Sequence, residues 1–148
     1  MTRSDFNIRL RFRSERASLA KVRAVVRSVL QMEGGFETED VDDVVLGLHE
    51  TLTNVTRHAY GGGSGVVDVT MNTGDGRFTA RVRDQGPSFD PSVAAEEAEI
   101  APRESGYGLM LVQRTMDRVT WRRRCGGNET RLERSVRPKL KSRRVSAR

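Results

Sequence analysis

The feature that most restricts the fold is the segment 38–60, where apolar residues recur at helical spacing. At about 100° per residue, one side of a helix here would carry Val41, Val45, Leu48, Leu52, Val55 and Ala59. Such a stripe predicts an amphipathic helix that packs on a core through one face. Thr38 is the candidate N-cap, and the acidic residues of the first turn suit the positive end of the helix dipole.

The opposite side of this predicted helix carries Gly47, Glu50, Asn54 and His58. One interpretation is a set of ordinary solvated residues. The other is the floor of a ligand site, in which Asn54 offers an uncharged oxygen to a hard cation and Glu50 acts as a base. Gly47 would leave room above that floor. His58 by itself is more typical of a hydrogen-bonding residue at a helix end than of a catalyst.

The rest of the chain divides into short periodic segments. Alternation predicts a strand at 6–12, a hairpin at 66–72 and 77–84, and a second hairpin at 119–124 and 130–136. Helical spacing predicts helices after Ser14 up to Met32, and at 107–118, with a long lid-like connection at 85–106. The resulting order favours an α+β two-layer sandwich, a mostly antiparallel mixed sheet with three helices on one face.

Charge is distributed unevenly along the chain. The net charge is +6, but residues 137–148 hold six Lys or Arg and no acid, so residues 1–136 carry 20 basic and 20 acidic groups. We therefore expect one domain at 1–136 and a basic, disordered tail at 137–148. The single cysteine, Cys125, excludes an intrachain disulfide, and no apolar run resembles a signal peptide or a membrane span. A cytoplasmic location is the expectation.

Two glycine segments add to the interpretation of the central helix. Asp84 ends a predicted strand just before Gly86, where a carboxylate could receive an exocyclic amine, although Asp and Gly are also ordinary turn residues. Gly106 and Gly108 precede an apolar helix, where free backbone N–H groups attract phosphate. Neither segment matches a Walker loop or a Rossmann fingerprint.

Together these segments resemble the GHKL ATPase superfamily. E-x-x-x-N at Glu50 and Asn54 is followed by D-x-G-x-x-F-D-P from Asp84 and by G-x-G-L from Gly106. The short chain and the wording HETLTNVTRHAY, VRDQGPSFDP and SGYGLMLVQRTMDRV are most similar to the anti-sigma-factor serine kinases, the RsbW and SpoIIAB group. The resemblance covers roughly residues 6–136.

The resemblance implies ATP and Mg²⁺ as cofactors. By similarity, Asn54 would hold Mg²⁺, Asp84 would accept a hydrogen bond from the adenine amino group, and Gly86 would let the ring approach. Thr130, in the G-x-E-T hairpin, would complete the adenine pocket. The remaining residues expected to contact ATP are Arg57, His58, Ser105, Gly106, Tyr107, Gly108 and Leu109.

The same resemblance implies two catalytic residues. Glu50 would take the proton from the attacking serine hydroxyl. Family kinases carry a lid arginine near the second glycine motif, and here Glu104 precedes Ser105-Gly106, so Arg103, one place further back, is the expected counterpart. Phosphoryl transfer depends mainly on positioning and charge neutralisation, which these residue types can supply.

The expected function is a protein serine kinase and anti-sigma factor in a partner-switching module that regulates transcription. Its partners would be a sigma factor, a STAS-domain antagonist that it phosphorylates, and a second copy of itself, with no membrane. The alternative is a non-kinase ATP-binding switch that activates or sequesters a regulatory partner. Nucleic-acid binding, through the tail, is a third and minor alternative, because the domain shows no basic stripe with interleaved aromatic residues.

Overall fold

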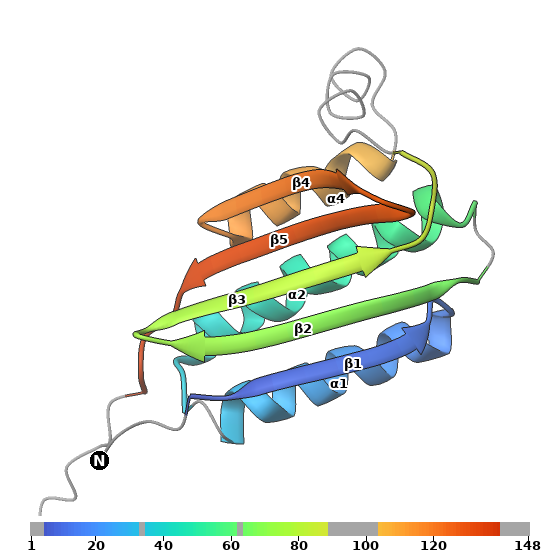
Figure 1. Cartoon of the computed structure of the whole chain (residues 1–148). Helices are drawn as coiled ribbons and strands as arrows, with labels where there is room; N and C mark the ends of the chain where they lie inside the picture. Colours follow the sequence, from blue (N-terminus) through green and yellow to red (C-terminus); the bar gives the residue numbers. More distant parts are fainter. Residues whose placement is uncertain (1–4, 33–34, 62–63, 89–103, 140–148) are drawn as a thin grey trace, which may run out of the picture.

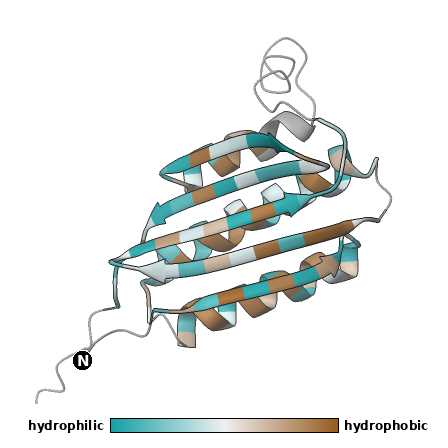
Figure 2. Cartoon of the chain, in the orientation of Figure 1, coloured by the Kyte–Doolittle hydropathy of each residue, from teal (hydrophilic) through white to brown (hydrophobic). Residues whose placement is uncertain are grey.

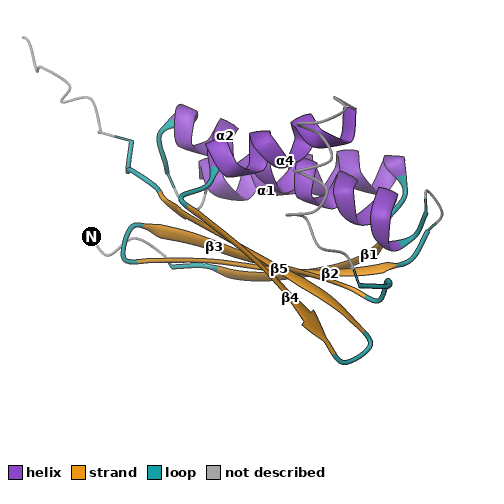
Figure 3. Ribbon diagram, turned by 90° about the horizontal axis from the view of Figure 1, so that it is seen from above, coloured by secondary structure: helices purple, strands orange, loops and turns teal. Residues whose placement is uncertain are grey.

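A single antiparallel sheet covered on one face by three helices forms the domain (Figure 1). The computed structural model describes residues 5–32, 35–61, 64–88 and 104–139. Seen from above, the helices form one layer and the strands the other, and the second face of the sheet carries no helix (Figure 3). The predicted α+β two-layer sandwich is confirmed.

The sheet has five strands in the order β1-β2-β3-β5-β4. Every described pairing is antiparallel. Their bounds are Asn7–Arg13 for β1, Val66–Gly74 for β2, Arg77–Asp84 for β3, Arg118–Arg124 for β4 and Gly127–Ser135 for β5. Asp75 and Gly76, with φ of 52° and 72°, join β2 to β3. Positive φ at both central residues makes a type I′ turn, the tight hairpin turn that an Asp-Gly pair favours.

The helices are α1 (Arg16–Met32), α2 (Thr38–Asn54) and α4 (Glu104–Thr115). The central segment was predicted as one helix to Tyr60, but α2 ends at Asn54 and a π-helical turn, Val55–Ala59, continues it. The third helix begins and ends three residues before its predicted bounds. None of the described helices is long and apolar enough to cross a membrane.

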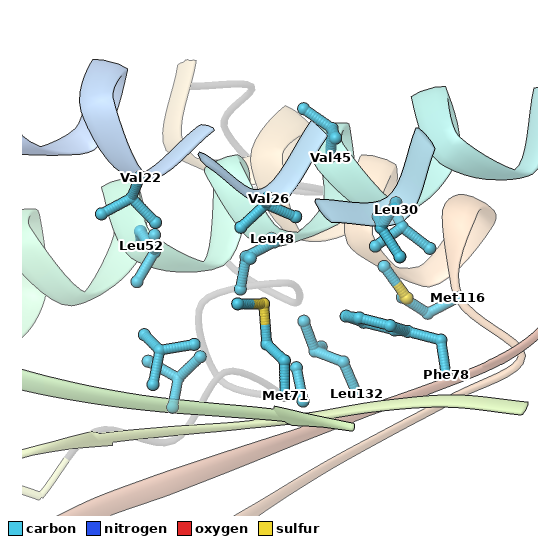
Figure 4. Close-up of a cluster of buried hydrophobic side chains, with 14 of the residues drawn as sticks. Val22, Val26, Leu30, Val45, Leu48, Leu52, Met71, Phe78, Met116 and Leu132 are labelled. Carbon is cyan, nitrogen blue, oxygen red and sulfur yellow. The ribbon is translucent and has the colours of Figure 1, made fainter. Parts of the chain in front are cut away.

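The core lies between the helix layer and the sheet (Figure 4). The predicted apolar stripe is confirmed, because its four members in α2 and its two members in the π-helical turn, Val55 and Ala59, are all buried. Alternate residues of the strands meet it, as the alternation of hydrophobic and hydrophilic positions along each strand shows (Figure 2). The largest fully buried side chains include Leu30 of α1, Leu48 and Leu52 of α2, and Met71, Phe78 and Leu132 of the sheet.

Two predicted helix caps differ in the structure. Ser14 does not cap α1. Its hydroxyl instead accepts a hydrogen bond from the Gly65 N–H at 3.3 Å, which ties the end of β1 to the start of β2. Thr38 is the first residue of α2, and the N-cap is Glu37, whose side chain makes no capping hydrogen bond. Charged contacts hold this helix start in place of a cap.

Asp40 is the centre of those contacts. It is 1% exposed and accepts hydrogen bonds from the Arg134 side chain at 3.0 Å and from the Arg137 backbone N–H at 2.7 Å. Burial acts to raise the pKa of Asp40, but the hydrogen bonds from Arg137 and Arg134 outweigh it and hold the pKa below its usual value. Asp40 therefore fastens the start of α2 to β5 and to residue 137, the first of the predicted tail.

Candidate functional site

Glu50 and Asn54 converge beside α4. A Cβ placed on Gly108 would lie 2.9 Å from Glu50 Oε2 and 3.5 Å from Asn54 Oδ1. One turn of helix separates the two residues, so both side chains leave α2 on the same side. Asn54 is 8% exposed, whereas Glu50 is half-buried. The backbone of α4 thus closes over a carboxylate and a carboxamide that would otherwise face water.

A pocket opens next to this point, between α2, the π-helical turn, α4 and the sheet. The helical side supplies Thr51, Asn54, Val55, His58, Ala59, Leu109 and Val112. The sheet supplies Asp84, Trp121, Arg122, Asn128, Glu129 and Thr130. Apolar walls with a few inward polar groups are typical of small-molecule sites. The pocket brings together five residues predicted from the sequence, namely Asn54, His58, Asp84, Leu109 and Thr130.

Asp84 lies at the sheet end of the pocket with one oxygen already engaged. It is 8% exposed, and its Oδ1 accepts hydrogen bonds from the Gly86 N–H at 2.8 Å and the Asn128 side-chain amide at 2.9 Å. Oδ2 accepts no hydrogen bond from the part of the chain that the structure describes. A buried carboxylate held in place by one oxygen leaves the other as an acceptor for a ligand N–H.

The end of the HETLTNVTRHAY segment positions that carboxylate. Tyr60 donates a hydrogen bond to the carbonyl oxygen of Val66 at 2.6 Å and accepts one from the Gln85 N–H at 2.9 Å. A Cβ on Gly86 would lie 2.5 Å from the Cα of Ala59. Glycine at 86 is therefore required by the close approach of Ala59, in addition to any ligand contact.

We expect Tyr60→Phe to lower the free energy of unfolding by about 0.5–1.5 kcal/mol, because the half-buried Val66 carbonyl and the exposed Gln85 N–H both lose a partner. The phenyl ring keeps the packing, so the change reports the hydroxyl alone. Urea unfolding of the two proteins measures it. A midpoint that does not move would show that the hydroxyl is not needed to hold the end of β3.

His58 lines the pocket, but Arg57 does not. Burial, and then the positive charge of Arg57, lower the pKa of His58, so its imidazole is neutral at physiological pH. Arg57 is exposed and lines a different hollow, between α1 and the end of α2, together with His49 and Thr53. The two neighbours in the sequence thus point to different sides of the helix end.

The glycine positions differ in part from what their spacing predicts. Gly47 does not leave room above Glu50, because a Cβ there would lie 2.5 Å from Met116 Cε and 2.6 Å from Thr115 Oγ1. The small residue instead lets α4 pack closely on α2. Gly106 and Gly108 do not precede the third helix but lie within α4. The first four N–H groups of a helix lack helical partners, so here they belong to residues 104–107.

Several residues predicted to contact ATP lie partly or wholly outside the part of the chain that the structure describes. Arg103 lies outside the described residues. The backbone of Ser105, Gly106 and Tyr107 belongs to the first turn of α4, and their side chains lie outside the description as well. No structural role is assigned to these side chains.

Three residues near the pocket were not predicted from the sequence. Trp121 of β4 pairs with Thr130 and lines the pocket. Asn128 also donates a hydrogen bond to the Pro87 carbonyl at 2.9 Å. A Cβ on Gly127 would overlap the carbonyl oxygen of Asp84. The G-N-E-T sequence motif could have pointed to Gly127 and Asn128. Only the register of β3 with β5 shows that Asn128 lies opposite Asp84.

The donors present fit the cofactors that the resemblance implies. Among the described residues, no three His, Cys, Asp or Glu side chains cluster in a way that could hold a metal. A cation here would rely on Asn54 and on ligand oxygens, which matches Mg²⁺, an ion commonly bound through few protein groups and substrate phosphates. The Oδ2 acceptor of Asp84 suits the exocyclic amine of adenine.

Comparison with known proteins agrees with this geometry. The serine-protein kinase RsbW of Staphylococcus epidermidis is 30% identical over 131 residues, which are 80% of this chain and 79% of that protein. The RsbW kinase of Listeria innocua is 31% identical over 102 residues, covering 62% of this chain and 64% of the relative.

Solved structures share the fold. The RsbU and RsbW domains of a Mycobacterium tuberculosis protein align with a TM-score of 0.66 and 21% identity, over 89% of this chain and 32% of that longer one. A histidine kinase domain from Erythrobacter litoralis aligns with a TM-score of 0.53 and 19% identity, over 81% of this chain and 60% of that one. Residues 12–134 match the histidine kinase-like ATPase domain. The chain belongs to the histidine kinase-like ATPase domain family.

Proposed function

We propose that the protein is an ATP- and Mg²⁺-dependent protein serine kinase and anti-sigma factor that works in the cytoplasm. The observation that carries the proposal is the convergence of Glu50 Oε2 and Asn54 Oδ1 beside Gly108, at the edge of a pocket that ends at Asp84. The similarity to serine-protein kinases named RsbW supports the same activity. The pocket holds the nucleotide, and the Glu50–Asn54 edge faces its phosphates.

The proposal assigns separate roles to the polar residues of the pocket. Asp84 Oδ2 accepts the hydrogen bond of the adenine amino group, and Thr130 lies in the neighbouring row of the sheet. Asn54 offers a neutral oxygen, which leaves a bound cation its full charge. Mg²⁺, when bound, neutralises charge on the β- and γ-phosphates. Neutral His58 lines the pocket wall.

Glu50 is the general base. Its carboxylate takes the proton of the substrate serine hydroxyl, the serine oxygen bonds to the γ-phosphorus, and the bond from phosphorus to the β,γ-bridging oxygen breaks to release ADP. Arg103 is the proposed lid arginine that faces the γ-phosphate. It precedes α4 directly, the helix whose backbone already lies over Glu50.

The proposed protein substrate is a STAS-domain antagonist, and the proposed client is a sigma factor. Phosphorylation of the antagonist would release it and leave the kinase free to hold the sigma factor. The second candidate is an ATP-binding switch without kinase activity. The one-residue offset of Arg103 from the arginine position of the family motif favours it, whereas retention of both Glu50 and Asn54 favours phosphoryl transfer.

Transfer of label tests the proposal. The protein is incubated with γ-labelled ATP, Mg²⁺ and candidate STAS-domain proteins, and we expect label on a serine of one of them. Asn54→Ala should abolish both transfer and the Mg²⁺-dependent part of ATP binding, whereas Arg144→Ala in the tail should leave both intact. Tight ATP binding without transfer to any STAS protein would favour the switch.

Gly108→Ala provides a milder test of the same geometry. The new methyl group would meet Glu50 Oε2 at 2.9 Å and displace the carboxylate. We expect transfer to fall about tenfold, since a small misplacement of a catalytic group is costly. Gly74→Ala, which has open space around its Cβ position, is the matched control. Equal transfer rates in the two variants would argue against Glu50 acting at this point.

A further inference from the structure

The sheet face that no helix covers has a strong excess of positive charge. Figure 2 views the sheet from this side, with the helices behind it. According to the strand registers, ten arginines and only three carboxylates point to this face. None of the described strands contains a lysine. The arginines are Arg9, Arg11, Arg13, Arg77, Arg81, Arg83, Arg118, Arg122, Arg124 and Arg131. We call this surface the arginine face.

The balanced charge of residues 1–136 concealed this segregation. A sum over the domain gave no net charge, and the sequence therefore predicted no basic surface. The structure corrects that prediction, because the period of two along each strand sends alternate arginines to one side while many of the acids lie on helices. The first turn and a half of α2 alone carries Glu39, Asp40, Asp42 and Asp43.

The three carboxylates of the arginine face hold its guanidinium groups in place. Each lies between two arginines: Asp68 between Arg9 and Arg11, Glu129 between Arg83 and Arg124, and Glu133 between Arg77 and Arg131. Each group of three has one surplus positive charge. Arg81, Arg118 and Arg122 form no ion pair with a carboxylate of the described residues. The face is therefore an ordered array of cations with donors left for a ligand.

A hollow on this face has the geometry of a phosphate site. Four arginines line it together with Thr120, Trp121 and Glu129: Arg81, Arg122, Arg124 and Arg131. Arg81, Arg131 and Thr120 stand in one row across β3, β5 and β4. The short Thr120 side chain leaves space between longer neighbours. Guanidinium forks bind phosphate oxygens in pairs, which is why arginine predominates where phosphate is recognised.

The composition of the arginine face distinguishes among polyanionic partners. Of the strand residues directed to it, only Val66 is a large apolar residue, and Trp121 of the edge strand β4 is the single aromatic residue that lines its hollow, too few to stack successive bases of a single strand. Protein interfaces have an apolar centre enriched in aromatic residues, and single-stranded nucleic acid stacks on aromatic rings. Interfaces with duplex nucleic acid are more polar and much more positively charged. The face matches the backbone of a duplex.

We propose that the arginine face binds the phosphate backbone of double-stranded DNA without sequence preference, with one phosphate in the hollow around Thr120. This activity is distinct from ATP binding in the nucleotide pocket on the helix side of the sheet, and the two hollows share Trp121 and Arg122 of the edge strand β4 and Glu129 of β5. Five strands about 4.8 Å apart and 3.3 Å per residue make a face of about 19 by 25 Å. Duplex DNA presents one charge per roughly 1.7 Å of axis, so a face of this size spans several phosphates.

Fluorescence anisotropy with a labelled duplex of about 20 base pairs, at about 50 to 250 mM NaCl, tests the proposal. The test variant is Arg81→Gln/Arg118→Gln/Arg122→Gln. None of these three arginines forms an ion pair among the described residues, so every carboxylate of the face keeps its partners. The first matched control, Lys21→Gln/Arg23→Gln/Arg114→Gln, removes the same charge from exposed helical positions. The second, Lys141→Gln/Arg143→Gln/Arg144→Gln, removes it from the tail. Melting temperatures confirm that all four proteins fold.

We expect the test variant to bind at least tenfold more weakly at about 100 mM NaCl, with a salt slope smaller by about 2–3, since each phosphate contact contributes about 0.9. Both controls should stay within about threefold of the parent protein. Equal loss in all three variants would mean a general charge effect, and loss in the tail variant alone would assign binding to the tail. Either result overturns the proposal. A third result would also overturn it: the test variant binds the duplex as well as the parent protein does, but it no longer binds phosphatidylserine vesicles or poly-glutamate.

Discussion

Glu50→Gln is expected to lower the rate of phosphoryl transfer by about 10²–10⁴-fold, which is the usual contribution of a general base. The amide keeps the size of the side chain but cannot take a proton from serine. Asn54 and Asp84 are untouched, so the ATP dissociation constant should change by no more than about threefold. Single-turnover transfer from labelled ATP to the STAS substrate, together with an equilibrium ATP titration, separates the two effects.

Glu39→Gln is the matched control for this experiment. It makes the same chemical change on the same helix, but Glu39 is 79% exposed and, among the described residues, pairs only with the exposed Arg137. It should transfer phosphate at the parental rate. If Glu50→Gln also kept that rate, the carboxylate beside Gly108 would not be the base, and the role of this edge of the pocket would be limited to binding.

Asp40→Asn is expected to lower the free energy of unfolding by about 1–3 kcal/mol, because the neutral amide weakens the hydrogen bonds that the buried carboxylate accepts from Arg134 and Arg137. Arg134, whose side chain is 14% exposed, keeps its second ion pair, with Asp43 at 2.9 Å, so its charge is not left without a partner. Urea unfolding near neutral pH measures the change. Asp42→Asn is the control, since its ion pair with Arg27 is largely exposed and such pairs contribute at most about 1 kcal/mol.

The Asp40 contribution should also depend on pH in a defined direction. The folded pKa of Asp40 lies below its usual value, so the folded state favours the ionised carboxylate. The added stability is complete above about pH 4, the pKa of an unfolded aspartate. It is lost as the pH falls through the lower folded value. The gap between parent and Asp40→Asn should therefore narrow in acid, and a gap of constant size down to about pH 2 would contradict this account.

Local patterns in the sequence were enough to predict most of the fold. The stripe of α2 and the alternation of the hairpin strands follow from side-chain periodicity, which depends only on neighbours in the chain. The start of α4 could not be predicted in the same way. Gly106 and Gly108 have low intrinsic helix propensity and so suggested a loop, whereas in the structure both lie within α4, which approaches Glu50 at Gly108 and Gly47 at Thr115.

The sequence predicted several residues of the candidate site, but it did not predict the hydrogen bonds that hold those residues in position. The spacing of Glu50 and Asn54 placed both on one side of a helix. The contacts that fix the pocket join distant segments, such as Asn128 to Asp84 across 44 residues and Tyr60 to Gln85 across 25. The arginine face also depends on which strands pair, so the sum of charges along the chain could not show it.

The central claim is that the pocket between α2, α4 and the sheet holds a purine triphosphate and its cation. A crystal structure of the complex with Mg²⁺ and a non-hydrolysable ATP analogue tests it most directly. The account predicts the adenine amino group within hydrogen-bond distance of Asp84 Oδ2, and the cation bound to Asn54 Oδ1 with Glu50 alongside. A nucleotide bound elsewhere, or a base turned away from Asp84 with no cation at Asn54, would contradict it.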